Sequence, residues 1–116
     1  MGRAAAERRG RTAEARAAWW LRLKGYRILE TRYKTPMGEI DLIVRRGGCI
    51  AFVEIKARPS LTAGLEAVSP RAQRRIARAA EAFLAQRGLT PRITRFDLIV
   101  MRPRRLPRHM ADAWRL

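Results

Sequence analysis

The hydrophobic residues of the chain recur with two different spacings, and the changes between them mark the elements of secondary structure. Helical spacing, ended in each case by a glycine, predicts helices over two segments: residues 12–24 and 70–86. Period-two alternation or short apolar runs predict strands over four segments: residues 26–33, 39–46, 49–57 and 93–102. The order helix, three strands, helix, strand contains no internal repeat and predicts one α/β domain over residues 12–102.

The connections between these segments predict how the strands are arranged. Gly47-Gly48 separates the two most apolar strands and favours a tight antiparallel hairpin. A loop over residues 57–68 follows, and Ser69 then caps the second helix with Pro70 at its first position. Because that helix joins the last two strands, they should run parallel with a right-handed crossover. We therefore expect a mixed sheet flanked by helices.

The net charge of the chain indicates what kind of partner it binds. The 116 residues include 26 Lys and Arg against 10 Asp and Glu, a formal net charge of +16. Self-repulsion of that size favours a bound polyanion, with nucleic acid as the first candidate and an anionic membrane surface as the weaker one. Both ends are basic, so residues 1–11 are expected to be a flexible arm and residues 103–116 a tail that packs on or near the domain.

Two further observations concern where such a protein would work. Cys49 is the one cysteine, so the chain forms no intramolecular disulfide, which is consistent with the reducing cytoplasm. The apolar runs are too short to cross a bilayer, and the basic N-terminal residues lack the apolar core of a secretory signal. The sequence therefore favours a cytoplasmic protein without a membrane partner.

The hairpin carries a cluster of charged residues. If Gly47-Gly48 forms a two-residue turn, Asp41 faces Glu54 and Glu39 faces Lys56 across the two strands. Strand alternation places these four side chains on one face of the sheet. It places the apolar residues of the same segments on the other face: Ile40, Leu42, Val53 and Ile55.

This arrangement is unfavourable without a cation. Facing carboxylates have Cβ atoms roughly 5 Å apart, and like charges at that spacing destabilise a sheet. A hard divalent ion, Mg²⁺ or Mn²⁺, between Asp41 and Glu54 would relieve the repulsion, and Lys56 could orient a water molecule for phosphodiester hydrolysis. The alternative is a structural ion-pair lattice in which Glu39 pairs with Lys56 and Asp41 is solvated. Residue spacing alone leaves both interpretations open.

Three motifs connect these residues to a known family. Together they closely resemble the YraN-like family of small bacterial proteins, which is assigned to the PD-(D/E)XK, or restriction-endonuclease-like, superfamily. The resemblance extends from about residue 10 to residue 114, and Holliday-junction resolvases of that superfamily have a similar helix–hairpin layout. The motifs are Gly38-Glu39-Ile40-Asp41-Leu42-Ile43, Phe52-Val53-Glu54-Ile55-Lys56-Ala57-Arg58 and Arg95-Phe96-Asp97.

The resemblance implies a fold and a set of roles. It implies an αβββαβ nuclease core with Asp41 and Glu54 as metal ligands and Lys56 as the catalytic lysine. It also implies a glutamate on the first helix, which Glu14 matches, and Glu39 is a candidate for supporting the metal ligands. The chain departs from the family where a lysine usually begins the second helix, because Ala72 occupies that place.

Arginines supply candidate contacts to nucleic acid. Four of them recur at helical spacing on one side of the second predicted helix, without an acidic residue between them. Such a stripe can hold phosphates without reading sequence, whereas the alternative is an ordinary solvated face. Arg58, directly after the third strand, is a further candidate. The four helix residues are Arg71, Arg74, Arg75 and Arg78.

Four other residues have less specific interpretations. Trp20 continues the apolar stripe of the first helix and is expected in the core. Trp19 either packs against the edge of the strands or is partly exposed, where it could stack on a base or a partner protein. Asp97 is expected to anchor the last strand through hydrogen bonds, with metal binding as the alternative. His109 in the tail is a weak metal or base candidate.

The favoured hypothesis is a Mg²⁺-dependent endonuclease that acts on DNA, preferred over RNA, and on branched DNA in particular. The chain offers one site, so cutting both strands would require a homodimer. The alternative is a non-catalytic nucleic-acid-binding module with a nuclease fold, which the missing lysine at Ala72 favours slightly. A third hypothesis, an assembly protein on ribosomal RNA, rests on charge alone.

Overall fold

The computed structural model describes residues 3–116, with side chains from Thr12 onward. The order of elements contains the expected αβββαβ core together with one further helix and one further strand. The elements are α1 (Arg3–Leu23), β1 (Arg27–Lys34), β2 (Glu39–Arg46), β3 (Cys49–Ala57), α2 (Leu61–Glu66), α3 (Pro70–Arg87), β4 (Ile93–Met101) and β5 (Arg108–Trp114).

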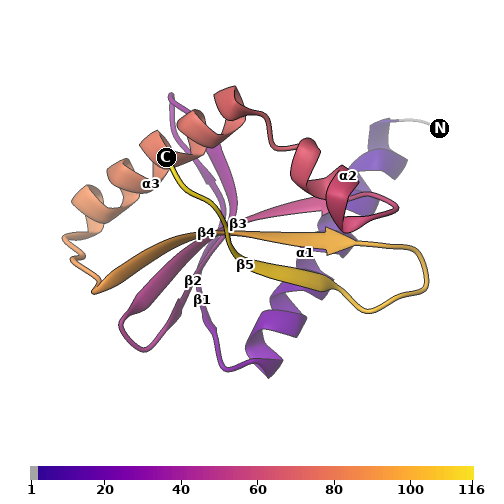
Figure 1. Cartoon of the computed structure of the whole chain (residues 1–116), viewed down its shortest axis with the longest axis horizontal. Coiled ribbons are helices and arrows are strands. Elements are labelled where there is room, and N and C mark those ends of the chain that lie inside the picture. The colour runs from indigo at the N-terminus through magenta and orange to yellow at the C-terminus, as the bar shows by residue number, and fades with distance from the viewer. Residues whose placement is uncertain (1–2) are drawn as a thin grey trace.

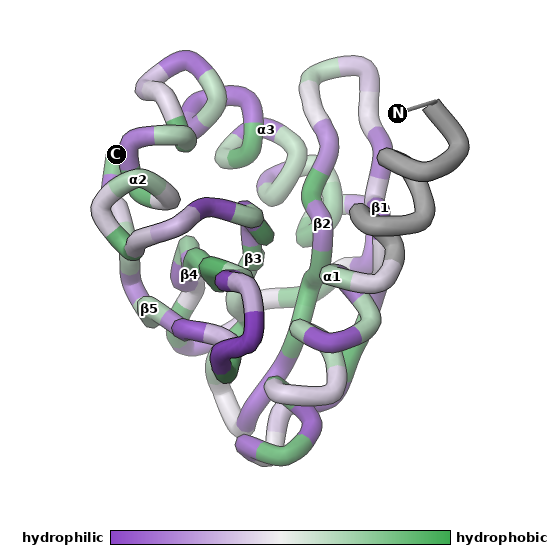
Figure 2. The backbone as a smooth tube through the Cα atoms, turned by 90° about the vertical axis from the view of Figure 1, so that its right-hand side faces the viewer, coloured by the Kyte–Doolittle hydropathy of each residue, from purple (hydrophilic) through white to green (hydrophobic). Residues whose placement is uncertain are grey.

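A mixed sheet forms the centre of the molecule, as the sequence predicts. The strands lie in the order β1-β2-β3-β4-β5, and every neighbouring pair is antiparallel except β3 with β4, which is parallel. Helix α1 covers one face of the sheet, whereas α2 and α3 cover the other (Figures 1 and 2). The chain therefore folds into three layers with a sheet that is buried on both sides.

Each face of the sheet has its own hydrophobic cluster. On the α1 side, the small residues Ala17 and Ala18 and the larger Leu21 pack on Leu42 and Val53. On the α3 side, the packing centres on aromatic rings. Its buried members include Ile40, Ile43, Phe52, Ile76, Phe83, Leu98 and Val100.

The caps of α3 agree with the sequence. The Ser69 side chain accepts a hydrogen bond from the Ala72 N–H, and Pro70 begins the helix. At the other end, Gly88 adopts a left-handed conformation with φ of 63°, which a residue without Cβ does at little cost. The boundaries of this helix are therefore set by local chemistry that the sequence displays.

The hairpin register is confirmed near the turn but changes at the site. Arg46 pairs with Cys49, and the regular pairing continues to Leu42 with Val53, where it ends. Beyond that point the predicted faces are wrong, because Ile40 lies in the α3-side cluster while Leu42 lies in the α1-side cluster.

The reason for the change lies in the neighbouring strand. Arg32 in β1 has a φ of 49°, a left-handed conformation that reverses the alternation of side chains. The pairing of β2 with β1 keeps its register at this point, with Tyr33 paired to Ile40 and Thr31 paired to Leu42, and the register shift of this strand pair lies further along, between Ile28 and Glu30. A two-residue period therefore does not hold across Asp41.

The ends of the domain differ from the prediction. Helix α1 begins at Arg3, so residues 3–11, expected to be part of a flexible arm, are helical. Helix α2 lies inside the segment expected to be a loop, and Ser60 caps it. The tail expected to be unpatterned contains β5, which pairs with β4. Trp20, expected in the core, is half-buried and belongs to neither cluster; from Thr12 onward, the buried residues of α1 are Ala17, Ala18 and Leu21.

A buried carboxylate fixes β5 to the sheet. Asp97 in β4 is fully buried and accepts hydrogen bonds from Arg95, from the Asp112 N–H and from His109, whose Nε2 lies 2.8 Å away. Burial alone would raise the pKa of Asp97, but these hydrogen bonds lower it to about 2. The Lys24 Nζ lies 2.7 Å from the other ring nitrogen of His109, Nδ1, and so links the end of α1 to the same group. We call these five residues the Asp97 cluster.

Candidate active site

Asp41 lies where the pairing of β2 with β3 ends. Its Oδ2 accepts a hydrogen bond from the backbone N–H of Ile55 at 2.8 Å, so the side chain takes the place of a strand carbonyl. A carboxylate held by a backbone donor in this way has a fixed position. The interruption of the ladder therefore places the Asp41 carboxylate beside β3, next to Glu54.

Glu54 is the most perturbed group at this position. Its side chain is 13% exposed. Burial, the hydrogen bond with the Asp41 carboxyl and the negative charge of Asp41 raise the pKa of Glu54 to about 9, while the charge of Lys56 acts against them. At neutral pH Glu54 therefore keeps its proton. The expected juxtaposition of these carboxyls is present, but it is reached through the irregular strand and not through regular cross-strand pairing.

Lys56 completes the cluster from the same strand as Glu54. Its Nζ lies 4.0 Å from the Glu54 Oε2, and its side chain is partly exposed. The expected pairing of Lys56 with Glu39 does not occur, because β2 has turned away and Glu39 instead pairs with Lys34 of β1. We refer to Asp41, Glu54 and Lys56 as the hairpin site.

A groove of about 520 Å³ opens beside the hairpin site. One wall comes from the strands, through Glu39 and Glu54, and the other from the first turns of α3, through Arg71 and Arg75. Ala72, the position at which the family resemblance implies a lysine, lies in the same wall. The groove thus combines carboxyls on one side, the exposed Glu39 and the half-buried Glu54, with arginines on the other, a combination suited to a phosphate that also binds a cation.

The groove owes its shape to a close backbone approach. The Arg75 Nε donates a hydrogen bond to the Met37 carbonyl at 3.1 Å, which joins α3 to the turn before β2. A Cβ atom added to Gly38 would lie 2.9 Å from the Arg75 carbonyl oxygen, closer than such atoms pack. Glycine at this position is therefore needed for α3 to lie next to the carboxylates.

The remaining predicted arginines lie around the groove and not in its lining. Arg74 and Arg78 are exposed on α3, one and two turns along the same side as Arg71 and Arg75. Arg58 is exposed after β3, and its guanidinium donates to the neighbouring Ala57 carbonyl. These positions allow contacts with a long ligand that extends beyond the groove.

Glu14 is connected to the hairpin site through another residue, Arg32. Its carboxylate accepts from the Arg32 Nε at 2.6 Å, so the helix glutamate is paired with a cation from β1. The hydrogen bond to Glu14 is the main cause that raises the pKa of Arg32, and the charges of Glu39 and Asp41 add to it. Arg32 was not anticipated from the sequence, because nothing in an exposed strand arginine indicates a left-handed conformation.

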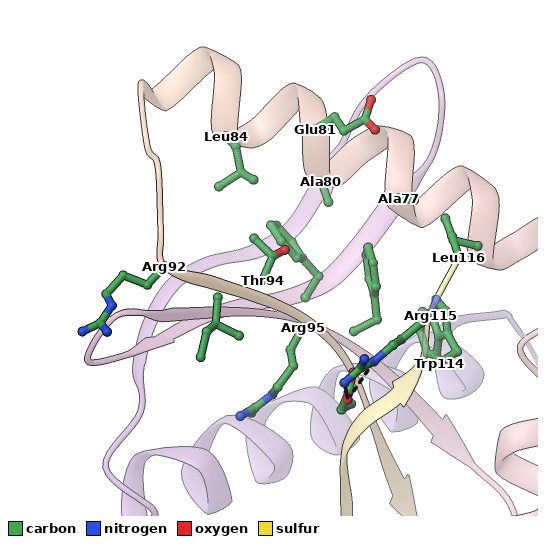
Figure 3. Close-up of a pocket in the computed structure, with 14 residues that line it drawn as sticks. Ala77, Ala80, Glu81, Leu84, Arg92, Thr94, Arg95, Trp114, Arg115 and Leu116 are labelled. Atoms are coloured by element: carbon green, nitrogen blue, oxygen red, sulfur yellow. Dashed lines mark hydrogen bonds and ion pairs between the residues drawn. The ribbon is translucent and has the colours of Figure 1, made fainter.

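A second cavity, of about 770 Å³, lies at the other end of the molecule between α3, β4 and the end of β5 (Figure 3). Its floor includes Phe96 and Trp114, whose rings stack at 5.5 Å. An ion pair between Arg115 and Asp112 closes one side (Figure 3). None of the residues expected to take part in catalysis lines this cavity, so it is separate from the hairpin site.

The donor set limits which metals could bind. Among the residues whose side chains the structure describes, no three His, Cys, Asp or Glu residues are grouped so as to hold a metal ion. Two neighbouring carboxyls remain, which suits a hard cation that keeps several waters and takes further oxygens from a substrate. It does not suit zinc, which is held by three or four protein ligands.

Within the described residues, no helix is both long and apolar enough to cross a membrane.

Comparisons with known proteins place the chain in a family. It is 53% identical over 115 residues to a UPF0102 protein of Parvibaculum lavamentivorans, covering 96% of this chain and 84% of the relative. It is 50% identical over 115 residues to a UPF0102 protein of Sphingopyxis alaskensis, covering 98% of each. A sequence model of the uncharacterised protein family UPF0102 matches residues 13–101, which include the whole hairpin site. The chain therefore belongs to family UPF0102, the YraN-like family that its motifs indicate.

Proposed function

We propose that the protein is a metal-dependent endonuclease that hydrolyses phosphodiester bonds in DNA, with branched DNA as the expected substrate. The observation that carries the proposal is the pair of neighbouring half-buried carboxyls, Asp41 fixed by the Ile55 N–H and Glu54 beside it, with Lys56 next to them. Such a pair binds a divalent cation once the proton leaves, and strongly perturbed carboxyls in a groove are typical of functional sites. A cytoplasmic location and a homodimer that cuts both strands belong to the same proposal.

Asp41 and Glu54 would hold a Mg²⁺ or Mn²⁺ ion. When bound, the ion would supply positive charge to the phosphoryl oxygens as the bond to the leaving oxygen breaks. The hydrogen bond from the Ile55 N–H keeps the Asp41 carboxylate in place before any ion arrives. Because little has to rearrange, the site is preorganised for a cation.

The other residues of the groove would position the substrate. Lys56 is partly exposed, so its ammonium can donate to a non-bridging oxygen of the scissile phosphate and orient the attacking water. Arg71 and Arg75 face the carboxyls across the groove and would contact phosphates of the bound strand. Glu14 would act at a distance by holding Arg32, whose charge balances that of Asp41.

A second candidate function is a nucleic-acid-binding module without catalysis. Two observations favour it: Ala72 lies in the groove where a lysine is usual, and Glu14 is paired with Arg32 and not directed at a metal. Under this alternative the arginines would still hold phosphates, whereas the carboxyl pair would have only a structural role.

Cleavage assays distinguish the two candidates. Pure protein is incubated with labelled linear, flapped and four-way DNA in Mg²⁺, Mn²⁺ or EDTA. We expect metal-dependent cutting that falls roughly a hundredfold or more in Lys56→Ala and in Asp41→Asn. The asparagine variant keeps an oxygen that can accept from the Ile55 N–H, so the hairpin should still fold.

A matched control is Asp112→Asn, which changes an exposed carboxylate paired with Arg115, outside the groove. It should leave cleavage unchanged. DNA binding by the wild type with no cutting of any of the substrates, in any of the metals, would favour the binding module over the enzyme.

A further inference from the structure

The side of α1 that faces away from the sheet carries a second apolar stripe. Its residues recur at helical spacing, and the loop between β4 and β5 adds Leu106 and Pro107 beside it to form a hollow of about 580 Å³. Large apolar side chains are unusually open here: Trp19 is 63% exposed, and Leu23 and Leu106 are each 68% exposed. We call this surface the Trp19 groove; its helix residues are Thr12, Ala15, Arg16, Trp19, Trp20 and Leu23.

The residues of this stripe do not pack in the hydrophobic core. The opposite side of α1, with Ala17, Ala18 and Leu21, already fills the space against the sheet. An exposed tryptophan among aliphatic residues on a monomer surface usually marks a binding site. The exposed apolar side chains Trp19, Leu23 and Leu106 are therefore available for a partner.

The charge around the groove indicates what kind of partner fits. None of the described residues that line it is acidic. Arg16 lies inside it, and Arg104 and Arg105 directly precede Leu106 in the loop. Among the residues whose side chains the structure describes, none forms an ion pair with these three arginines. An aromatic ring flanked by unpaired arginines is complementary to a nucleobase flanked by phosphates.

The groove also has the right location. Strands β3 and β4 are parallel, with Lys56 paired to Val100 and Ala57 to Met101, and the Arg58 N–H donates to the Met101 carbonyl at 3.2 Å. The β4–β5 loop consequently leaves the sheet at the same end as the hairpin site, and in Figure 2 it projects toward the viewer beside α1. A strand that leaves the hairpin groove on the α3 side would pass over this end of the sheet to reach α1 on the other side.

We propose that the Trp19 groove binds a single-stranded segment of nucleic acid, with a base stacked on the Trp19 ring and phosphates held by Arg16, Arg104 and Arg105. A single strand is required, because the bases of a duplex are stacked on each other and cannot cover a protein ring. From Thr12 to Leu23 the helix extends about 16 Å, enough for a few nucleotides. The inference rests on the proposed nucleic-acid partner, but it does not depend on catalysis.

A binding experiment in EDTA tests the inference apart from cleavage. Fluorescence anisotropy measures the affinity for labelled (dT)20 and for a duplex of the same length. We expect Trp19→Ala to weaken binding of (dT)20 by roughly 5- to 100-fold and of the duplex much less, while Trp19→Phe keeps most of the affinity. Binding of (dT)20 should also quench tryptophan emission in the wild type more than in Trp19→Phe.

Matched controls come from the other end of the molecule. Ile93→Ala removes an exposed apolar side chain, and Arg92→Ala removes an exposed arginine, both at the second cavity. These variants should keep the wild-type affinity for (dT)20, whereas Arg105→Ala should weaken it and make it less dependent on salt.

Two results would overturn the inference. One is an unchanged affinity of Trp19→Ala for (dT)20. The other is a wild-type dimer in sedimentation that Trp19→Ala converts to a monomer of unchanged DNA affinity, because the groove would then bind a second copy. If cleavage fails but Trp19→Ala weakens binding, only the proposed hydrolysis is wrong; if cleavage occurs and binding is unaffected, only the present inference is wrong.

Discussion

Two carboxyl clusters lie on the same sheet, one around the fully buried Asp97 and one around the half-buried Glu54, and their surroundings shift the two pKa values in opposite directions. Asp97 receives a guanidinium, an imidazole and a backbone N–H, and these donors hold the pKa of Asp97 at about 2. Glu54 faces another carboxyl, and the pKa of Glu54 rises to about 9. In the first cluster the chain supplies all the positive charge that the carboxylate needs, which is typical of structure. In the second it supplies less, which is typical of a site that awaits a ligand.

The largest expected effect comes from breaking the structural cluster. Asp97→Asn leaves Arg95 and His109 without their anionic partner inside the protein, so we expect the free energy of unfolding to fall by roughly 3–5 kcal/mol. Urea denaturation followed by circular dichroism measures it. Asp112→Asn serves as the control and should change stability little, because its carboxylate is exposed. Near-native stability of Asp97→Asn would show that the two clusters do not differ as described.

We expect a divalent cation to bind at the hairpin site and not at the Asp97 cluster. An ion that binds only the folded state at about 100 times its dissociation constant stabilises by about 2.7 kcal/mol. We expect Mn²⁺ or Mg²⁺ to raise the melting temperature of the wild type, and EDTA to reverse the shift. Glu54→Gln should lose most of it, since an amide is a weaker ligand than a carboxylate. An equal shift in both proteins would place the ion elsewhere.

The dependence of stability on pH should differ in sign between the clusters. The pKa of Glu54 is raised from 4.5 to about 9 in the folded state, so its contribution is complete below about pH 4.5 and is lost as the pH rises toward 9. Asp97 behaves in the opposite way, because its lowered pKa contributes stability above about pH 3.8 that is lost as the pH falls toward 2.

Urea denaturation at several pH values checks both signs. Glu54→Gln should flatten the curve between pH 5 and pH 9 and leave the acid limb intact, because the amide does not titrate and the Asp97 cluster is unchanged. A wild-type curve that is already flat between these values would contradict the raised pKa of Glu54.

The sequence predicted the parts of the fold that local chemistry determines. Gly47-Gly48 set the turn of the hairpin, and Ser69, Pro70 and Gly88 set the ends of α3. Strand β5 was missed because its register depends on distant groups: Asp97 binds His109 and the Asp112 N–H from another strand. No pattern within residues 108–114 reveals such partners.

The sequence predicted which residues lie together at the candidate site better than it predicted how they are arranged. Asp41, Glu54 and Lys56 do lie together, but regular alternation does not bring them there. The left-handed Arg32 reverses the alternation, and the Asp41 carboxylate then binds the Ile55 N–H. A positive φ at an arginine is a tertiary effect, which periodicity cannot anticipate. The ion pair of Glu14 with that arginine was unforeseen for the same reason.

Left-handed residues have a consequence at the borders of the sheet. Strands β1 and β5 are its two edges, and each contains one non-glycine residue with positive φ, Arg32 at 49° and Asp112 at 56°. An edge strand with such a kink cannot offer a long, flat row of free N–H and carbonyl groups to another molecule. The irregularities that shape the hairpin site and anchor β5 thereby also protect both edges from strand-to-strand aggregation.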